Sequence, residues 1–233
     1  MVVFINVACE CLLIASCLFS IRKIINSDPR NIFSTHYTPK NPLAFIILFA
    51  SIAFAACLGI INYASLNAQL SSYHPIVSRY VASLILPLLL PLAVIQSIGY
   101  GPIQMTAALG QVVITALIAF IGVVIYNEQF NGIRSGLFSI PHAVEELLGV
   151  GSVIFCLLYA VYGYLTAGSS ASAVRFKCLH MIYAVVAMIV ADSVLKNQLL
   201  SGTDVRPFER VDLFHIIFSL AMIFLGNVAV GSF

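Results

Sequence analysis

The chain has 233 residues, of which 61% are hydrophobic and only 9% are charged, and its formal net charge is +2. Soluble domains are about 45–50% apolar and about 25% charged. A soluble fold of this size has too little interior for so much apolar surface, so the surrounding solvent must be lipid. The small net charge, without a basic patch or a glycine-rich phosphate loop, argues against a nucleic-acid partner. We therefore expect an integral membrane protein whose main partner is the bilayer.

Seven apolar runs, each long enough to cross a bilayer, follow one another along the chain. They predict one all-α domain over residues 1–233, a bundle of seven transmembrane helices. Their approximate ranges are 2–21, 42–65, 77–98, 103–126, 142–167, 175–197 and 209–230. Pro87 and Pro91 lie inside the third run, where each removes a backbone hydrogen bond, and they predict a kink there.

The first run is predicted to be a retained transmembrane helix rather than a cleaved signal peptide, because Arg22 and Lys23 follow it instead of preceding it. Basic residues beside a span favour the cytosolic side. The first span is uncharged before it and basic after it, which places the N-terminus outside and the C-terminus in the cytosol. The alternate connections divide the Lys and Arg residues almost equally, six against five, so this prediction depends on the first span.

The cysteines are expected to be free and buried, because nearly all of them fall inside apolar runs and no CxxC pair occurs. They are Cys9, Cys11, Cys17, Cys57, Cys156 and Cys178.

Several polar residues fall within or at the ends of the runs. An ionisable group at membrane depth costs roughly 2.5–3.5 kcal/mol unless it is paired or faces a cavity. Glu10, the deepest in the first run, either lines a functional cavity or bonds to a neighbouring helix to hold the bundle together. Asn62 and Tyr63 end the second run and can line a water-filled mouth, although Tyr63 can also anchor the chain at the interface. Asp192 either lines the same cavity or pairs with Lys196, one turn later.

The histidines outside the last run suggest less. His142 and Glu146, four residues apart at the start of the fifth run, have the spacing of a helical metal half-site but also suit an interfacial polar face. His180 is expected at the interface. His36 and His74 fall in predicted loops and receive no role.

A candidate catalytic pair lies at the start of the last run, in the segment RVDLFHIIFSLAMIFLGNVAV. Asp212 and His215 are three residues apart and share one face of a helix. The carboxylate can orient the imidazole through its ring N–H, or share a metal ion with it. The alternative is a polar pair at the membrane interface.

The run DLFHIIFSLAMIFLGNVA resembles the last helix of bacterial members of the CREST superfamily, seven-helix membrane proteins that include alkaline ceramidases and progestin/adipoQ receptors. The resemblance covers mainly this run. It implies a zinc ion, held by histidines, that activates water for amide hydrolysis in lipids, and it carries over one zinc ligand, His215. Two positions depart from the pattern: Ser219 stands four residues after His215, and GIINYAS contains no histidine. Zinc catalysis normally uses three protein ligands, so unusual ones such as Glu10 or Asp212 would be needed.

Three functions remain open at this point. The first is a divergent lipid-amide hydrolase with an incomplete zinc site, the second is a non-catalytic subunit that packs with other membrane subunits, and the third is a small transporter or channel. A retinal photoreceptor is excluded because residues 211–233 contain no lysine. The hydrolase interpretation predicts that the first, second and last runs adjoin. The residues expected to converge there are Glu10, Asn62, Asp212 and His215.

Overall fold

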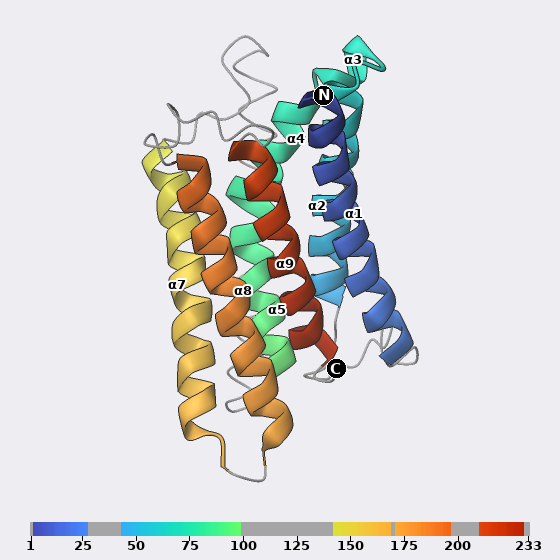
Figure 1. Cartoon of the computed structure of the whole chain (residues 1–233). Helices are drawn as coiled ribbons and strands as arrows, with labels where there is room; N and C mark the ends of the chain where they lie inside the picture. Colours follow the sequence, from blue (N-terminus) through green and yellow to red (C-terminus); the bar gives the residue numbers. More distant parts are fainter. Residues whose placement is uncertain (1, 28–42, 99–141, 169–170, 197–209, 231–233) are drawn as a thin grey trace.

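The computed structural model describes residues 2–27, 43–98, 142–168, 171–196 and 210–230, and within them the regular structure is helical, without strands. Five of the helices run uninterrupted along the bundle in Figure 1. They are α1 (Val2–Ser27), α2 (Leu43–Tyr63), α7 (His142–Thr166), α8 (Ser172–Lys196) and α9 (Arg210–Val230). A sixth, composite segment is built from α3 (Ala68–Ser71), α4 (His74–Tyr80), the π-helical turn η1 (Val81–Ile85) and α5 (Leu86–Ile98).

Within the described residues, six helical segments are long and apolar enough to cross a membrane. The predicted all-α membrane bundle is thus confirmed for six of its seven runs, and the fourth run, about 103–126, lies outside the described residues. Helices extend beyond the predicted ranges: α1 continues past its basic pair to Ser27, and α4 already begins at His74. Long basic side chains can leave a helix end and reach water, so a helix need not stop where its apolar run stops.

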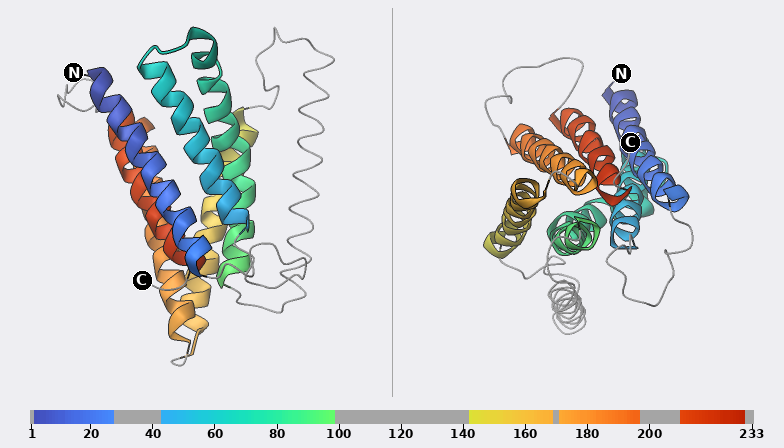
Figure 2. Two further views of the ribbon diagram at one scale, coloured as in Figure 1. Left: turned by 90° about the vertical axis from the view of Figure 1, so that its right-hand side faces the viewer. Right: turned by 90° about the horizontal axis from the view of Figure 1, so that it is seen from below.

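The helices stand side by side with their ends at two opposite faces. We refer to the end where α1 and α9 begin as the upper end, and to the opposite end, where α9 stops, as the lower end (Figure 1). The α3 and α4 helices lie at the upper end, α5 stops near the lower end, and α7 begins again at the upper end (Figure 1). In the view from below, α9 lies between α8 and α1, and α1 also packs against α2 (Figure 2). The predicted neighbourhood of the first, second and last spans is confirmed.

A close contact between α1 and α9 depends on a glycine. A Cβ on Gly226 would lie 2.5 Å from Ser20 Oγ and 3.3 Å from the Ser20 Cα, so only glycine allows the two backbones to approach this closely. The Ser20 hydroxyl also donates a hydrogen bond of 3.0 Å to the Met222 carbonyl. Small residues at such seams are how membrane helices gain packing contacts, because lipid tails are as apolar as the helices themselves.

Polar side chains join the lower ends of four helices. Lys23 of α1 donates to Asn227 Oδ1 of α9 at 2.8 Å, and Ser97 of α5 donates to the Val228 carbonyl at 2.6 Å. Lys177 of α8 donates to the Ser97 carbonyl at 2.7 Å. Carbonyl groups in the last turn of a helix have no partner within that helix, so these bonds satisfy groups that lipid could not. These hydrogen bonds hold the lower half of α9 against α1 and α5.

The expected distortion near Pro87 and Pro91 takes the form of the π-helical turn η1. Pro87 then falls in the first turn of α5, where a missing backbone N–H is tolerated best, and Pro91 lies inside α5. The wider turn absorbs the change in hydrogen bonding within the composite segment.

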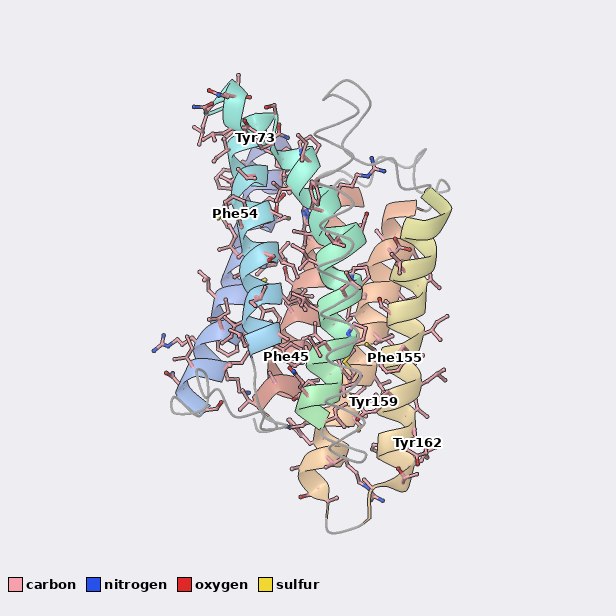
Figure 3. All side chains as sticks on the ribbon, turned by 180° about the vertical axis from the view of Figure 1, so that it is seen from behind. Phe45, Phe54, Tyr73, Phe155, Tyr159 and Tyr162 are labelled. Atoms are coloured by element: carbon pink, nitrogen blue, oxygen red, sulfur yellow. The ribbon has the colours of Figure 1, made fainter. Side chains whose placement is uncertain are left out.

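The outer surface is apolar, as lipid contact requires. Phe54 of α2 and Tyr162 of α7 are exposed, and Figure 3 shows both on the outside of the bundle. Phe45, in contrast, is buried and stacks on Phe49 with ring centroids 5.9 Å apart. The expectation of free cysteines holds, although two of the six, Cys11 and Cys57, are exposed rather than buried.

Candidate functional site

Glu10 lies in the third turn of α1 and is the most deeply placed carboxylate of that helix. Only 1% of the residue is exposed. Its carboxylate approaches the His215 ring of α9, with Oε1 and Nε2 3.7 Å apart. That distance exceeds a hydrogen bond, and the Glu10 carboxylate makes none with any residue that the structure describes. A buried carboxylate without a hydrogen bond is expensive and requires an explanation.

Gly59 of α2 makes room for this carboxylate. A Cβ at position 59 would overlap the carboxylate of Glu10, with Cδ at 2.7 Å, and would lie 3.2 Å from His74 Nε2. One small volume next to the α2 backbone therefore borders both side chains. The Glu10 carboxyl carbon and His74 Nε2 can be no further apart than the sum of these two distances.

His74 reaches this position because the chain reverses direction at the upper end. It is the first residue of α4, not part of a loop as the sequence suggested, and Pro75 in the first turn favours a helix start there. Its ring packs edge-on against Tyr63 of α2, with centroids 6.0 Å apart. The Ser71 hydroxyl donates to the Asn62 side chain, which fixes α3 to the end of α2. Pro75 was the signal that could have identified this helix from the sequence.

The two candidates on α9 have different partners on α1. Asp212 is fully buried in the first turn of α9, where the helix dipole favours a carboxylate, and it is in hydrogen-bonding contact with the Cys9 thiol. His215 faces Glu10 instead, and its ring packs against that of Phe214 at 5.3 Å. The two carboxylates, Glu10 and Asp212, lie close enough to repel each other.

We call this group of side chains the polar cluster: Glu10, His74, Asp212 and His215, around Gly59. It draws on α1, α2, α4 and α9 in the upper half of the bundle. The expected convergence of Glu10 and His215 is confirmed by their 3.7 Å separation. Asn62 and Tyr63 lie at its edge and hold α3 and α4, rather than facing Glu10 directly.

Other candidates lie elsewhere. Asp192 is exposed on α8, unlike the buried carboxylates of the polar cluster. His180 was expected at the interface but is buried, with its ring 4.0 Å from that of Phe176, because α8 turns this face toward α9. The side chains of His142 and Glu146 lie outside the described part of the structure, as does His36, so the half-site prediction stays untested.

The donor atoms of the polar cluster are of the types that bind zinc, but they do not surround a common position. Two histidines and a carboxylate form a ligand set of catalytic zinc sites. The rings of His74 and His215, like the Glu10 carboxylate, make no hydrogen bond with the described residues. Yet across those residues no three His, Cys, Asp or Glu side chains already have the spacing of a metal site. Glu10 and His215 come nearest, since two ligands of a tetrahedral zinc stand roughly 3.4 Å apart at bond lengths of ~2.0–2.1 Å.

Comparison of this chain with family models, with curated proteins and with solved structures finds no match. The functional argument therefore rests on the side chains themselves.

Proposed function

We propose that this chain is a seven-helix membrane protein with a CREST-like bundle, and that its polar cluster is the site of a divergent lipid-amide hydrolase. The observation that carries the proposal is the convergence of Glu10, His74 and His215 within the apolar bundle, each with a side chain that makes no hydrogen bond to the described residues. Buried ionisable groups inside a membrane bundle most often mark a functional site.

The seventh span is part of this proposal. The α5 helix stops near the lower end and α7 begins at the upper end (Figure 1). The sequence between them contains the apolar run of about residues 103–126. A single crossing by this run would join the two ends and complete the count of seven, which also puts the two termini on opposite sides of the membrane.

The contacts favour a reactive site over helix adhesion for Glu10. A residue that holds helices together should bond to a neighbouring helix, as Ser20 does with the Met222 carbonyl. Glu10 makes no such bond to the described residues, and an unsatisfied buried polar group costs about 1–3 kcal/mol. A protein that keeps such a cost at one position generally gains function there.

The arrangement suits activation of water. A carboxylate and an imidazole 3.7 Å apart can both bond to one water molecule beside them, and Glu10 can take its proton as a general base while the water attacks a carbonyl carbon. The neutral imidazole of His215 can hold the same water in place, and a proton on Glu10 can pass to the departing amine.

Hydrolysis of lipids by the detergent-purified chain tests the proposal. We expect release of fatty acid from long-chain N-acyl lipids, measured by mass spectrometry, and a loss of about 10²–10⁴-fold in Glu10→Gln, as removal of a general base predicts. Asp192→Asn is the matched control, because Asp192 is exposed on α8, and it should retain full activity. Absence of hydrolysis from a panel of lipid amides and esters, or an active Glu10→Gln, contradicts the proposal.

A further inference from the structure

We infer that His74 is a further catalytic residue of the polar cluster, and that its Nε2–H donates a hydrogen bond to the carbonyl oxygen of the substrate amide. The inference rests on the proposed function and extends it, because it gives the attacked carbonyl group a partner of its own. Glu10 and His215 hold the attacking water, which leaves His74 for the oxygen on which negative charge develops.

The position of His74 is the first argument. Its Nε2 lies 3.2 Å from the point where a Cβ of Gly59 would stand, and the Glu10 Cδ lies 2.7 Å from the same point. The carboxylate that takes the proton of the water and a nitrogen that can donate a hydrogen bond are therefore close neighbours. A carbonyl carbon attacked by that water has its oxygen within reach of Nε2, as stabilisation of the developing charge requires.

The bonding state of His74 is the second argument. Its ring nitrogens make no hydrogen bond with any described residue, and its contact with Tyr63 is an edge-on packing of the two rings. A neutral imidazole has one N–H, which in one of its two tautomers is on Nε2. Glu10 beside it has no hydrogen bond to a described residue either, although only 1% of that residue is exposed. Polar groups inside an apolar bundle normally have partners, so an open donor beside an open acceptor indicates a site for a bound molecule.

The anchoring of α4 is the third argument. Before α4, Asn67 caps α3 by accepting from two backbone N–H groups at 3.0 Å, and the Ser71 hydroxyl donates to the Asn62 side chain. After α4, the π-helical turn η1 sets the rotation of α4 relative to α5, and such turns often occur at functional sites. His74 is thus held from both ends of its helix. A donor that is fixed before the reaction stabilises developing charge without the cost of reorganisation.

The reaction balances with His74 in this role. Glu10 takes a proton from the water while the water oxygen bonds to the carbonyl carbon, and the electron pair of the C=O bond moves to the oxygen that His74 holds. When the C–N bond breaks, that pair returns, and the proton on Glu10 passes to the departing nitrogen. The products are a carboxylic acid and an amine, and His74 keeps its proton throughout.

Steady-state kinetics of the detergent-purified full chain test the inference, with a long-chain N-acyl lipid and its thioamide analogue as the two substrates. Sulfur accepts hydrogen bonds weakly, so the thioamide loses the bond to His74. We expect His74→Phe, which keeps a ring against Tyr63 but has no N–H, to lower kcat by about 10²–10³-fold with little change in KM. The preference of the wild type for the oxygen substrate should fall in His74→Phe by a similar factor.

Two further variants serve as controls. His74→Gln retains an N–H donor on its side-chain amide and should recover part of the lost kcat. His180→Ala removes a buried histidine from α8 and should keep both the kcat and the substrate preference of the wild type.

The outcomes separate the two proposals. An active wild type whose His74→Phe variant keeps its kcat, or loses kcat with an unchanged substrate preference, overturns the role of His74 and leaves the proposed function standing. Should His74→Phe fail to fold, His74→Met, which is adaptable in shape and has no donor, takes its place with the same expectation. A wild type that hydrolyses neither substrate overturns both proposals. An inactive His74→Phe beside a fully active Glu10→Gln rejects Glu10 as the base and retains the role of His74.

Discussion

At the scale of single residues, Gly59 determines whether the polar cluster can form. A methyl group there overlaps the Glu10 carboxylate, with its Cδ at 2.7 Å. We expect Gly59→Ala to displace Glu10 and to destabilise the protein by about 1–3 kcal/mol, the usual cost of overpacking. Thermal unfolding in detergent measures this. Gly149→Ala is the matched control, since a Cβ there meets nothing within 4 Å, and it should leave the midpoint unchanged or slightly raised. Equal midpoints for the two variants would contradict the prediction.

Glu10 offers a second test at this scale. Replacement by Met, which is apolar and of similar length, removes a buried carboxylate without a hydrogen bond to the described residues. We expect Glu10→Met to raise the stability of metal-free protein, measured with a chelator present, by about 1–3 kcal/mol. Ser20→Ala is the contrast: it removes a real bond between helices and should cost about 0.6 kcal/mol. A destabilised Glu10→Met would show that Glu10 serves as a helix contact.

At the scale of elements, the α1–α9 seam sets the distance across which Glu10 and His215 face each other. Gly226→Ala brings a Cβ within 3.3 Å of the Ser20 backbone, so the helices must separate. We expect a loss of about 1–3 kcal/mol in thermal stability. Ser20→Gly in the same chain should restore part of it, because the two positions are in contact and such pairs couple by about 0.5–3 kcal/mol. Strictly additive effects would mean that the seam is looser than described.

The second element that matters is the reversal at the upper end. Two residues singled out in the sequence, Asn62 and Tyr63, act there through others: Asn62 bonds to Ser71 and Tyr63 packs against His74. They position α4 rather than face Glu10.

At the scale of the whole molecule, the lower end carries a small excess of the basic residues that the structure describes. Arg22 and Lys23 lie near the C-terminal end of α1 and Arg175 and Lys177 near the start of α8, at the lower end (Figure 1). Three others lie at the upper end, Arg79 of α4, Lys196 of α8 and Arg210 of α9 (Figure 1). By the preference of basic residues for the cytosolic side, we propose that the lower end faces the cytosol and the polar cluster lies toward the outer leaflet.

Thiol labelling of intact cells checks this orientation. Ser72 and Ser172 are both exposed, and they lie at the upper and lower ends respectively. We expect Ser72→Cys to react with a membrane-impermeant maleimide from outside, and Ser172→Cys to react only after permeabilisation. The wild-type chain, whose exposed Cys11 and Cys57 lie within the apolar helices, provides the background. The reverse pattern would invert the orientation, and labelling of both from one side would contradict the topology.

The sequence by itself determined the class of this protein. Its apolar runs require lipid as the surrounding solvent, and their length is that of membrane-spanning helices. It also identified Glu10 and His215, because an ionisable residue in such a run is costly wherever the helix packs. The sequence could not predict that these two residues lie close together, because helix packing decides which helix faces Glu10. That packing depends on complementary surfaces such as the Gly226–Ser20 contact. Nor could the sequence place His74 beside Gly59, because the reversal of the chain after Asn62 brings this imidazole there, and such a distance is a property of packing.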